Sequence, residues 1–381
     1  MCPRAYGPPT RTDTPLEDPV TTETAAATRA PTVDPDRLMS FVLRAVEEVG
    51  ATLGAALVVL GDELGYYRAL ADRGPLDAAD LAAATGTDVH YAREWLDAQA
   101  AGAVLTYDPA TRRYTLPIEH AVALTDESSA AFLPGLFQIA VGTVADASRI
   151  ADAARRGEGV GWHEHNRDVH HGCERFFRPG YHAHLVEEWL PAVGVVDRLR
   201  AGARVADVGC GHGASTVLMA QAFPASRFVG SDYHPESIEV ARARAAEAGV
   251  ADRVSFEVAP ADGFSGAGLD LVTTFDALHD MGDPLGAARH VRAALAEDGV
   301  WMVVEPMAGD RAEENHHAIG RAFYGFSTLL CTPASLAQDV GLALGTQAGP
   351  ARIREITEAA GFTRFRSAAQ TPFNRVLAVE P

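Results

Sequence analysis

The stretch RVADVGCGHGAST, residues 204–216, joins an apolar run to a glycine-rich turn. Residues 204–208 are typical of the end of a buried parallel strand, and residues 214–222 have the apolar spacing of a helix. The turn between them contains three spaced glycines: Gly209, Gly211 and Gly213. Because glycine has no Cβ, a ligand can lie directly against this backbone and face the unpaired amides of the helix that follows. The sequence predicts a strand, a ligand-binding turn and a helix.

Asp207, the acid just before the glycines, bears on which ligand the turn binds. The spacing Gly209-x-Gly211-x-x-Ala214 also satisfies the dinucleotide-binding fingerprint, which alone is a weak signal. A carboxylate aimed into the loop would repel a pyrophosphate but attract a ligand that carries an ammonium and a sulfonium group. S-adenosylmethionine is such a ligand. The alternative is that Asp207 only accepts hydrogen bonds from the loop, as buried carboxylates often do.

The pattern D-x-G-x-G-x-G at 207–213 resembles motif I of the class I S-adenosylmethionine-dependent methyltransferases. The resemblance implies a doubly wound, Rossmann-like α/β sheet of seven strands, with S-adenosylmethionine as the cofactor. The sequence provides seven strand patterns, with helical segments for both faces of the sheet. These patterns lie at 205–208, 227–230, 254–258, 269–275, 300–304, 362–368 and 375–379. We expect residues 196–381 to form this cofactor-binding domain.

The composition limits the partners of the chain. Its 381 residues carry 51 acidic and 32 basic side chains, all of the latter arginine, for a formal charge of −19. Such a field disfavours nucleic acid as the main partner. The four cysteines lack CxxC spacing, which favours a reduced, cytoplasmic setting, and no apolar run is long enough to span a membrane.

The N-terminal third predicts an interaction module. Residues 1–36, rich in Pro, Thr, Asp and Ala, have the composition of a disordered leader. Residues 37–125 combine helical spacing at 38–70 with a winged helix, whose second helix at 89–101 is acidic rather than basic. The phrase LDAADLAAATGT at 76–87 resembles the N-terminal dimerisation domain of the small-molecule O-methyltransferases. The resemblance implies a homodimer.

Residues 126–195 are expected to form a helical linker and an active-site lid. A connecting helix is predicted over 130–156, followed by the histidine-rich segment WHEHNRDVHHGCERFFRPGYHAH at 162–184. Its histidines lack a recognised metal-binding spacing, so no protein-bound metal is predicted there. In the O-methyltransferases an aromatic helix at this place covers the cofactor and the substrate, which implies pocket roles for Phe177, Arg178 and Tyr181. The alternative is that these rings are core, as their helical spacing allows.

Further candidate cofactor residues follow motif I in order. Asp232 and Tyr233 end the second strand, where an acid can accept both ribose hydroxyls. The turn after the third strand resembles the family's adenine-binding G-D-x-F turn with its glycine displaced. The resemblance implies that this turn contacts the adenine through three residues: Asp262, Gly263 and Phe264. Phe275, at the end of the fourth strand, is expected to line the same site.

The segment DALHDMGDP at 276–284 resembles the L-H-D-W-x-D-E segment of the O-methyltransferases, in which the histidine is the general base. The resemblance implies that His279 takes the proton of the acceptor, beside Asp280, and that Glu305 orients its imidazole. An imidazole titrating near pH ~6.5 suits the deprotonation of a phenol-like hydroxyl. The alternative is a structural histidine at a helix end. A helical insert at 311–349 is expected to line the acceptor pocket through His316, His317 and Tyr324.

Together these features predict a methyltransferase that transfers a methyl group to a small-molecule acceptor by O-methylation. Two alternatives stay open. One is a metal-assisted C-methyltransferase of a keto acid, in which His279, Asp280 and another histidine bind the metal. The other is a cofactor-binding regulator that acts on DNA through the winged helix, against which the acidic second helix argues. The identity of the acceptor does not follow from the sequence.

Overall fold

The computed structural model describes residues 32–381 of the chain. Most of the expected leader, 1–36, therefore lies outside the described residues, and helix α1 (Pro35–Glu63) already begins inside its last part. The chain divides into two units, Met1–Glu48 and Val49–Pro381, and the boundary between them falls within α1. Among the helices of residues 32–381, none combines the length and apolarity needed to cross a lipid bilayer.

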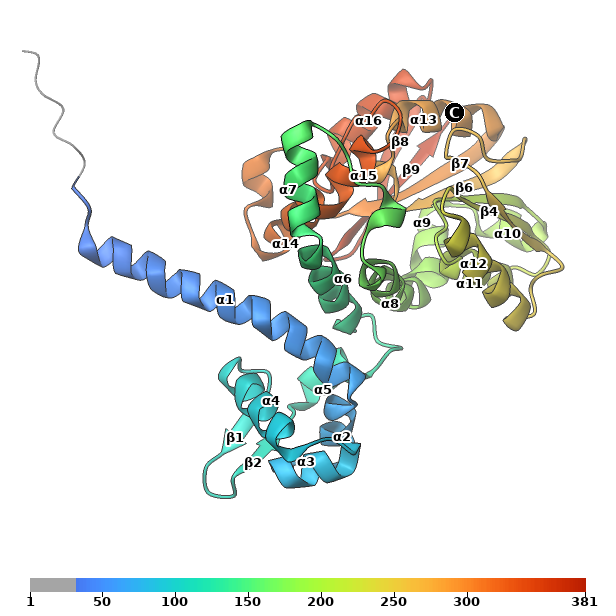
Figure 1. Ribbon diagram of the computed structural model, residues 1–381. Coiled ribbons are helices and arrows are strands. Elements are labelled where there is room, and N and C mark those ends of the chain that lie inside the picture. Colours follow the sequence, from blue (N-terminus) through green and yellow to red (C-terminus); the bar gives the residue numbers. More distant parts are fainter. Residues whose placement is uncertain (1–31) are drawn as a thin grey trace, which may run out of the picture. The chain divides into compact units, whose positions relative to one another are not determined.

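A small winged-helix region follows α1 in the second unit, as the sequence predicted (Figure 1). Its elements are α2 (Tyr66–Arg73), α3 (Ala78–Thr85), α4 (Val89–Ala101), β1 (Thr106–Asp108), β2 (Arg113–Thr115) and α5 (Ile118–Thr125). The side chains of Asp77 and Asp88 cap α3 and α4 by accepting backbone N–H groups of their first turns. Trp95 of α4 packs edge-on against Tyr66 and Tyr67 of α2, which closes the small core.

Helices α6 (Pro134–Ala145), α7 (Ala147–Arg156) and α8 (Arg167–His184) lead from this region to the large sheet, with the short turn η1 (Trp162–Glu164) before α8. The single helix expected over 130–156 is wrong, because the chain breaks at Asp146. The carboxylate of Asp146 accepts the backbone N–H of Asn166 at 2.8 Å and so ties the break to the start of α8. Helix α8 continues into the π-helical turn η2 (Leu185–Trp189) and α9 (Leu190–Val193).

The large sheet has seven strands in the order β5-β4-β3-β6-β7-β9-β8, as expected for the doubly wound fold. The strands are β3 (Arg204–Val208), β4 (Arg227–Asp232), β5 (Val254–Val258), β6 (Leu269–Phe275), β7 (Leu295–Pro306), β8 (Arg364–Gln370) and β9 (Asn374–Glu380). Strands β3 to β7 pair in parallel, and β9 runs antiparallel to both of its neighbours. The strand order reverses between β3 and β6, and ligands of such sheets bind outside the carboxyl ends at this point.

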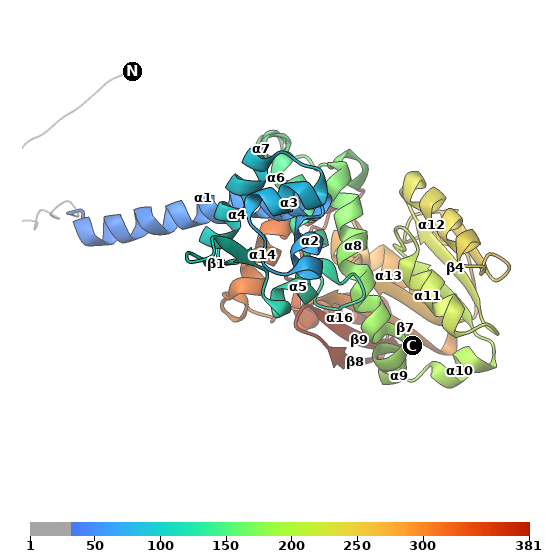
Figure 2. The ribbon, with the colours of Figure 1, turned by 90° about the horizontal axis from the view of Figure 1, so that it is seen from below.

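Alternate residues of the central strands belong to two separate cores. On one face Val205 and Leu271 pack with α10 (Val196–Ala201), α11 (Ala214–Ala222) and α12 (Pro235–Glu247). On the other face Ala206 and Val272 pack with α13 (Pro284–Ala294) and α16 (Gly349–Ala359). Figure 2 shows α11 and α12 on the opposite side of the sheet from α16. Period-two alternation thus buries both faces of the sheet.

The remaining elements lie around the carboxyl ends of the strands. They are η3 (Leu278–Asp280) after β6, and η4 (Ala312–Asn315), α14 (Ala318–Phe326), the π-helical turn η5 (Ser327–Cys331) and α15 (Thr332–Leu336) after β7. The insert expected at 311–349 is therefore helical from η4 to α15. Its last part, before α16, has no regular structure.

Helices α6 and α8 lie in close contact at two glycines, and this contact generates a stability prediction. A Cβ on Gly172 would lie 2.7 Å from the backbone nitrogen of Ile139 and 2.8 Å from the carbonyl oxygen of Gly135. Gly172→Ala should therefore force the helices apart and lower the free energy of unfolding by about 1–3 kcal/mol.

Gly180 offers the matched control, because a Cβ there meets nothing within 4 Å. Gly180→Ala, in the same helix, should be neutral or stabilising by up to about 1 kcal/mol. Urea denaturation of both variants measures the difference. Equal effects of the two substitutions would contradict close α6–α8 packing.

Candidate active site

A large cavity lies where the strand order reverses. Its lining residues come from the loops after β3, β4, β5 and β6, from α8, from the insert α14–α15 and from the turn between β8 and β9. The cavity therefore collects residues from both halves of the sheet and from the helices that precede and follow it. It is the position that the topology assigns to a ligand.

The glycine turn forms one wall of this cavity. Gly209, Gly211 and Gly213 all have positive φ, of 73°, 52° and 73°, a region that side chains other than glycine rarely adopt. A Cβ on Gly209 would meet Ala277, and one on Gly213 would meet Phe256, so these two glycines allow close packing within the protein. A Cβ on Gly211 would meet no protein atom within 4 Å. Gly211 is therefore the glycine that faces open ligand space.

Asp207 does not line the cavity. Its carboxylate is buried and accepts hydrogen bonds from three hydroxyls: Ser215 at 2.7 Å, Thr216 at 2.6 Å and Thr273 at 2.8 Å. Burial raises the pKa of Asp207 above its ordinary value, although the three hydroxyls oppose that shift. In this arrangement Asp207 ties β3 to the first turn of α11 and to β6. It shapes the glycine turn from behind.

Asp232 and Tyr233 lie in the cavity wall at the end of β4. Asp232 accepts the backbone N–H of Gly211 through Oδ2 and that of His234 through Oδ1, both at 2.9 Å. Burial raises the pKa of this carboxyl group. Each carboxylate oxygen can accept a second hydrogen bond, so Asp232 can also accept hydrogen bonds from the hydroxyl groups of a ligand.

The turn after β5 presents residues other than the three expected at the cavity. Asp262 and Gly263 are exposed, and Phe264 is buried in the core with its ring 4.6 Å from that of His290. None of the three lines the cavity. The lining residues of this turn are instead Ala259, Pro260 and Ala261, which come earlier in the chain. The displaced glycine noted in the sequence was the signal that the spacing differs here.

His279 and Glu305 form a buried pair at the cavity. The Nδ1 atom of His279 lies 2.6 Å from Oε2 of Glu305, and the other carboxylate oxygen accepts the backbone N–H of Leu278 at 2.9 Å. Since a carboxylate can only accept, the contact places a proton on Nδ1. The imidazole is thereby held with Nε2 toward Asp280 and Cys331.

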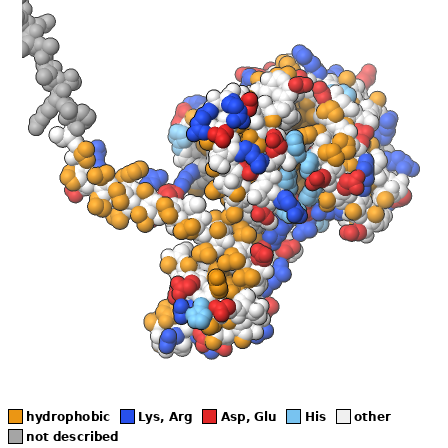
Figure 3. Space-filling view, viewed as in Figure 1, with side chains coloured by type: hydrophobic (Ala, Val, Ile, Leu, Met, Phe, Trp, Pro, Cys, Tyr) orange, Lys and Arg blue, Asp and Glu red, His pale blue; other side chains and the backbone are white. Residues whose placement is uncertain are grey.

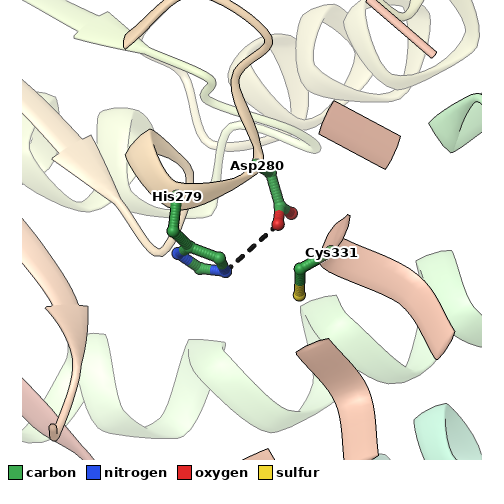
Figure 4. A group of neighbouring side chains, drawn as sticks. All are labelled: His279, Asp280 and Cys331. Carbon is green, nitrogen blue, oxygen red and sulfur yellow. Dashed lines mark ion pairs between the residues drawn. The ribbon is translucent and has the colours of Figure 1, made fainter. Parts of the chain in front are cut away.

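Asp280 and Cys331 complete a cluster with His279 (Figure 4). Oδ1 of Asp280 lies 3.1 Å from Nε2 of His279, and one donor atom from each residue lies within 4.8 Å of the others. The hydroxyl of Thr346 donates to Sγ of Cys331 at 3.3 Å. Cys331 stands on the insert, far from the other two residues in sequence. The sequence does not single out Cys331, because nothing in its local pattern distinguishes it from an apolar core residue.

The charged groups in this cluster shift one another's pKa values. Burial disfavours the imidazolium form of His279, but the carboxylates of Asp280 and Glu305 outweigh burial and hold its pKa well above the ordinary value. Burial raises the pKa of the Asp280 carboxyl, and burial together with Asp280 raises that of the Cys331 thiol to about 11. The two carboxylates therefore favour the imidazolium form of His279, and burial favours the neutral form of the Cys331 thiol.

Asp276, the residue after β6, is a second site residue that the sequence analysis did not single out. Its φ of 49° is in the left-handed region, which Asp tolerates better than most residues. Oδ1 accepts a hydrogen bond from Nδ2 of Asn374 at 2.7 Å, whereas the buried Oδ2 has no partner among the described residues. Both Asp276 and Asn374 line the cavity.

The expected acceptor-pocket residues divide into two groups. Phe177 and Tyr181 line the cavity, with Phe275 beside the Tyr181 ring at 5.0 Å. Arg178 does not line it and forms an ion pair with Glu127 at 3.2 Å.

The three residues expected from the insert also lie elsewhere. His316, His317 and Tyr324 do not line the cavity, and His317 caps α14 by accepting the N–H of Gly320. The insert instead contributes four apolar side chains: Phe323, Phe326, Leu330 and Ala334. Their three- and four-residue spacing was the signal that could have found them.

Comparisons with known proteins match two parts of this chain. Residues 199–338 match the methyltransferase domain family, and residues 51–126 match the Rv2258c-like winged HTH domain. The chain contains a methyltransferase domain. It is preceded by a winged helix-turn-helix domain.

Individual relatives match in sequence over shorter spans. The 27-O-demethylrifamycin SV methyltransferase of Amycolatopsis mediterranei is 36% identical over 103 residues, which cover 26% of this chain and 38% of that protein. The trans-aconitate 2-methyltransferase of Variovorax paradoxus is 33% identical over 144 residues, which cover 37% of this chain and 53% of that protein. The chain thus spans about half, or less, of the length of these curated relatives.

The fold is shared over almost the whole chain. Human N-acetylserotonin methyltransferase, solved in complex with SAM, superimposes with a TM-score of 0.65 at 16% identity. The superposition covers 92% of this chain and 99% of the human one. The seven-stranded architecture with its N-terminal helical region is therefore that of known methyltransferases.

The matched methyltransferase domain contains only part of the cavity. The glycine turn, Asp232, His279, Glu305 and Cys331 lie within residues 199–338. Helix α8 and the β8–β9 turn, which complete the walls, lie outside that range. The family likeness therefore covers the loops at the strand ends better than the aromatic walls.

The buried His279–Glu305 pair generates a prediction about pH. Because the folded-state pKa of His279 is raised, its proton stabilises the fold most below the unfolded pKa of about 6.5, and this contribution is lost as pH rises through the folded-state pKa. Glu305→Gln should lower that pKa and destabilise the protein by about 1–3 kcal/mol at low pH.

Urea denaturation at several pH values, together with NMR titration of the imidazole, measures both effects. Glu297→Gln, an exposed change on the same strand, is the control and should leave the pH profile unaltered. A stability difference between wild type and Glu305→Gln that grows with rising pH would contradict the assignment.

Proposed function

We propose that this protein is an S-adenosylmethionine-dependent methyltransferase that methylates a hydroxyl of a small molecule, with His279 as general base. The observation that carries the proposal is that some of the expected cofactor-binding residues and the expected base line one cavity. The open Gly211 and Asp232 lie on one wall, and His279, which Glu305 holds through its Nδ1, lies on another. A donor bound along the first wall and an acceptor bound at the second would meet inside the protein, away from bulk water.

The residues at the first wall fit S-adenosylmethionine. The backbone of Gly211 leaves space for the ligand, Asp232 offers acceptor positions for ribose hydroxyls, and Ala259 to Ala261 provide a small, flat surface for the adenine. Phe275 lines the same cavity as His279. The bound cofactor supplies an electrophilic methyl group, and the protein positions the acceptor in line with it.

The acceptor side fits base catalysis once His279 loses its extra proton. Glu305 fixes the Nδ1–H tautomer, so Nε2 is the atom that takes the proton of an acceptor hydroxyl. Asp280 opposes this proton transfer, because its carboxylate beside Nε2 stabilises the imidazolium form of His279. The rate should therefore rise with pH as His279 deprotonates, and Asp280→Asn should move that rise to lower pH.

A metal-assisted methyltransferase is the second candidate, because His279, Asp280 and Cys331 offer nitrogen, oxygen and sulfur ligands around one point. Glu305 on Nδ1 of the histidine and the Thr346 hydroxyl on the sulfur are the kind of contacts that orient metal ligands. In this candidate Cys331, rather than the further histidine expected from the sequence, would be the third donor. A bound divalent cation would supply the positive charge that a keto acid acceptor needs, since no arginine or lysine of the described chain lines the cavity.

We further propose that the chain forms a homodimer through α1. This helix exposes a run of large apolar side chains (Figure 3). They include Leu38, Phe41, Leu43, Val46, Val49 and Leu53. A second copy would cover them.

The domain boundaries at 37–125, 126–195 and 196–381 are also part of the proposal. So is a cytoplasmic setting, which suits the free thiols of Cys173, Cys210 and Cys331.

The cofactor prediction concerns Gly211. Wild-type protein should bind S-adenosylhomocysteine in calorimetry, and Gly211→Ala should weaken binding about tenfold or more because its Cβ would enter ligand space at a positive φ. Gly249→Ala is the matched control, since Gly249 has a φ of 67° but lies outside the cavity. Binding of NAD in place of S-adenosylhomocysteine would overturn the proposal.

A second prediction separates base catalysis from metal assistance. If His279 is the base, His279→Ala slows methylation of a phenolic acceptor by about a hundred- to ten-thousand-fold, and chelators and Cys331→Ala have little effect. If it is a ligand, chelators mimic that loss, and Cys331→Ala removes both metal and activity.

Metal analysis of the purified protein accompanies these assays. Cys173→Ala is the control, because Cys173 lines the same cavity outside the cluster. Activity that survives both His279→Ala and chelation would exclude both candidates and leave catalysis by positioning alone.

The dimer prediction concerns the exposed face of α1. Wild type should be a dimer in light scattering, and the double change Val46→Glu and Leu53→Glu should give monomers because charges would replace the covered apolar surface. Val240→Glu, an exposed apolar change on α12, should leave the dimer intact. A wild-type monomer at micromolar concentration would refute the proposal.

A further inference from the structure

The charged side chains that line the cavity are predominantly acidic. Within residues 32–381, no arginine or lysine lines the cavity, whereas four carboxylates do: Glu174, Asp232, Asp276 and Asp280. Glu174 pairs with Arg244 at 3.0 Å, Asp232 accepts two backbone amides, and Asp280 pairs with His279. Among the described residues, Asp276 is the one of the four with a buried oxygen that has neither a hydrogen-bond nor an ion-pair partner.

The backbone holds Asp276 firmly in place. Its N–H donates to the carbonyl of Val304 at 2.8 Å, which continues the β6–β7 ladder, and its left-handed φ of 49° then turns the chain into η3. Nδ2 of Asn374 donates to Oδ1 at 2.7 Å. A side chain fixed at both its backbone and one oxygen cannot easily turn its second oxygen toward water.

Oδ2 of Asp276 is buried and has no hydrogen-bond partner among the described residues. Leaving a buried carboxylate oxygen unpaired is unfavourable, and neighbouring acids add to the effect. Burial, followed by the negative charge of Glu305, raises the pKa of Asp276 well above its ordinary value. His279 is the nearby cation, but Glu305 and Asp280 already flank both of its nitrogens. Among residues 32–381, the cavity lining therefore offers Asp276 no arginine or lysine, and its histidine cation is already paired.

Aromatic side chains line the same cavity as this carboxylate. The rings of Tyr181 and Phe275 are 5.0 Å apart, and those of Phe176 and Phe373 are 5.8 Å apart. Aromatic faces attract cations, and flat apolar walls suit an aromatic ligand. A buried carboxylate with such walls and without a protein cation is suited to a ligand that brings its own positive charge.

We propose that Asp276 is a specificity-determining residue that receives a positively charged nitrogen of an aromatic methyl acceptor through Oδ2. The inference deepens the proposed function and rests on it for the identity of the reaction. It favours amine-bearing phenols over neutral ones, and disfavours carboxylic acids. The ammonium group of the cofactor is the other source of such a charge, and the test separates the two.

Three phenols of similar size and different charge test the proposal: tyramine, 4-ethylphenol and 4-hydroxyphenylacetate. Binding to the full-length protein is followed by calorimetry and thermal shift, without cofactor. Tyramine should bind about ten- to a hundredfold more tightly than 4-hydroxyphenylacetate, with 4-ethylphenol between them, because a buried carboxylate discriminates strongly by charge.

Asp276→Asn should abolish the preference for tyramine while keeping the fold, since asparagine tolerates a positive φ and can still accept from Asn374. Glu174→Gln is the matched control, because that lining carboxylate already has an arginine partner, and the preference should remain. S-adenosylhomocysteine should bind equally well to wild type and Asp276→Asn.

Two results would overturn the proposal. One is a wild type that does not rank the three phenols by charge, including one that binds none of them. The other is an Asp276→Asn protein that keeps the ranking but loses affinity for S-adenosylhomocysteine, which would assign the carboxylate to the cofactor's ammonium. A wild type that ranks the phenols but fails to bind S-adenosylhomocysteine would leave the cation site standing and refute the proposed methyl transfer.

Discussion

The buried carboxylate of Asp207 holds the centre of this structure together. It accepts hydroxyls from Ser215 and Thr216 in the first turn of α11 and from Thr273 in β6. These contacts join the first strand of the sheet to the helix after the glycine turn and to the strand across the switch point. A buried acid without such donors would be strongly destabilising. The position of the turn, and hence of the cavity wall at Gly211, depends on them.

The cavity built on this centre has two sides with different origins. The side formed by the glycine turn and Asp232 lies within the matched methyltransferase domain and uses backbone groups and one acid. The opposite side adds aromatic rings from α8 and from the β8–β9 turn, outside that domain. A cofactor shared by a family can be recognised by the first side. We propose that the second side selects the acceptor, whose identity then depends on residues for which the family gives little guidance.

The sequence predicted the fold well because the fold is encoded locally. Apolar runs, turn glycines and capping acids mark the elements, and all seven strands of the large sheet lie where their patterns indicated. The helix expected over 130–156 was the exception, since its break at Asp146 depends on a contact with Asn166 that becomes adjacent only in the folded chain.

The site was predicted less completely, because side-chain direction is not a local property. The His279–Glu305 pair joins η3, which follows β6, to the neighbouring strand β7, and the sequence predicted this contact. Cys331 comes from the insert after β7 and was missed. Phe264 has the residue type expected of an adenine contact, yet its ring turns into the core. Asp276 was overlooked because its proposed role follows from an unpaired oxygen, which no sequence pattern reveals.

The central claim is that one cavity brings a methyl donor against the His279–Glu305 pair. A crystal structure of the protein with S-adenosylhomocysteine tests it most directly. The account predicts that the ribose contacts Asp232, that the backbone of Gly211 lies against the ligand, and that the ligand sulfur points toward the part of the cavity that His279 lines. A ligand bound elsewhere, or one whose sulfur points away from His279, would contradict it.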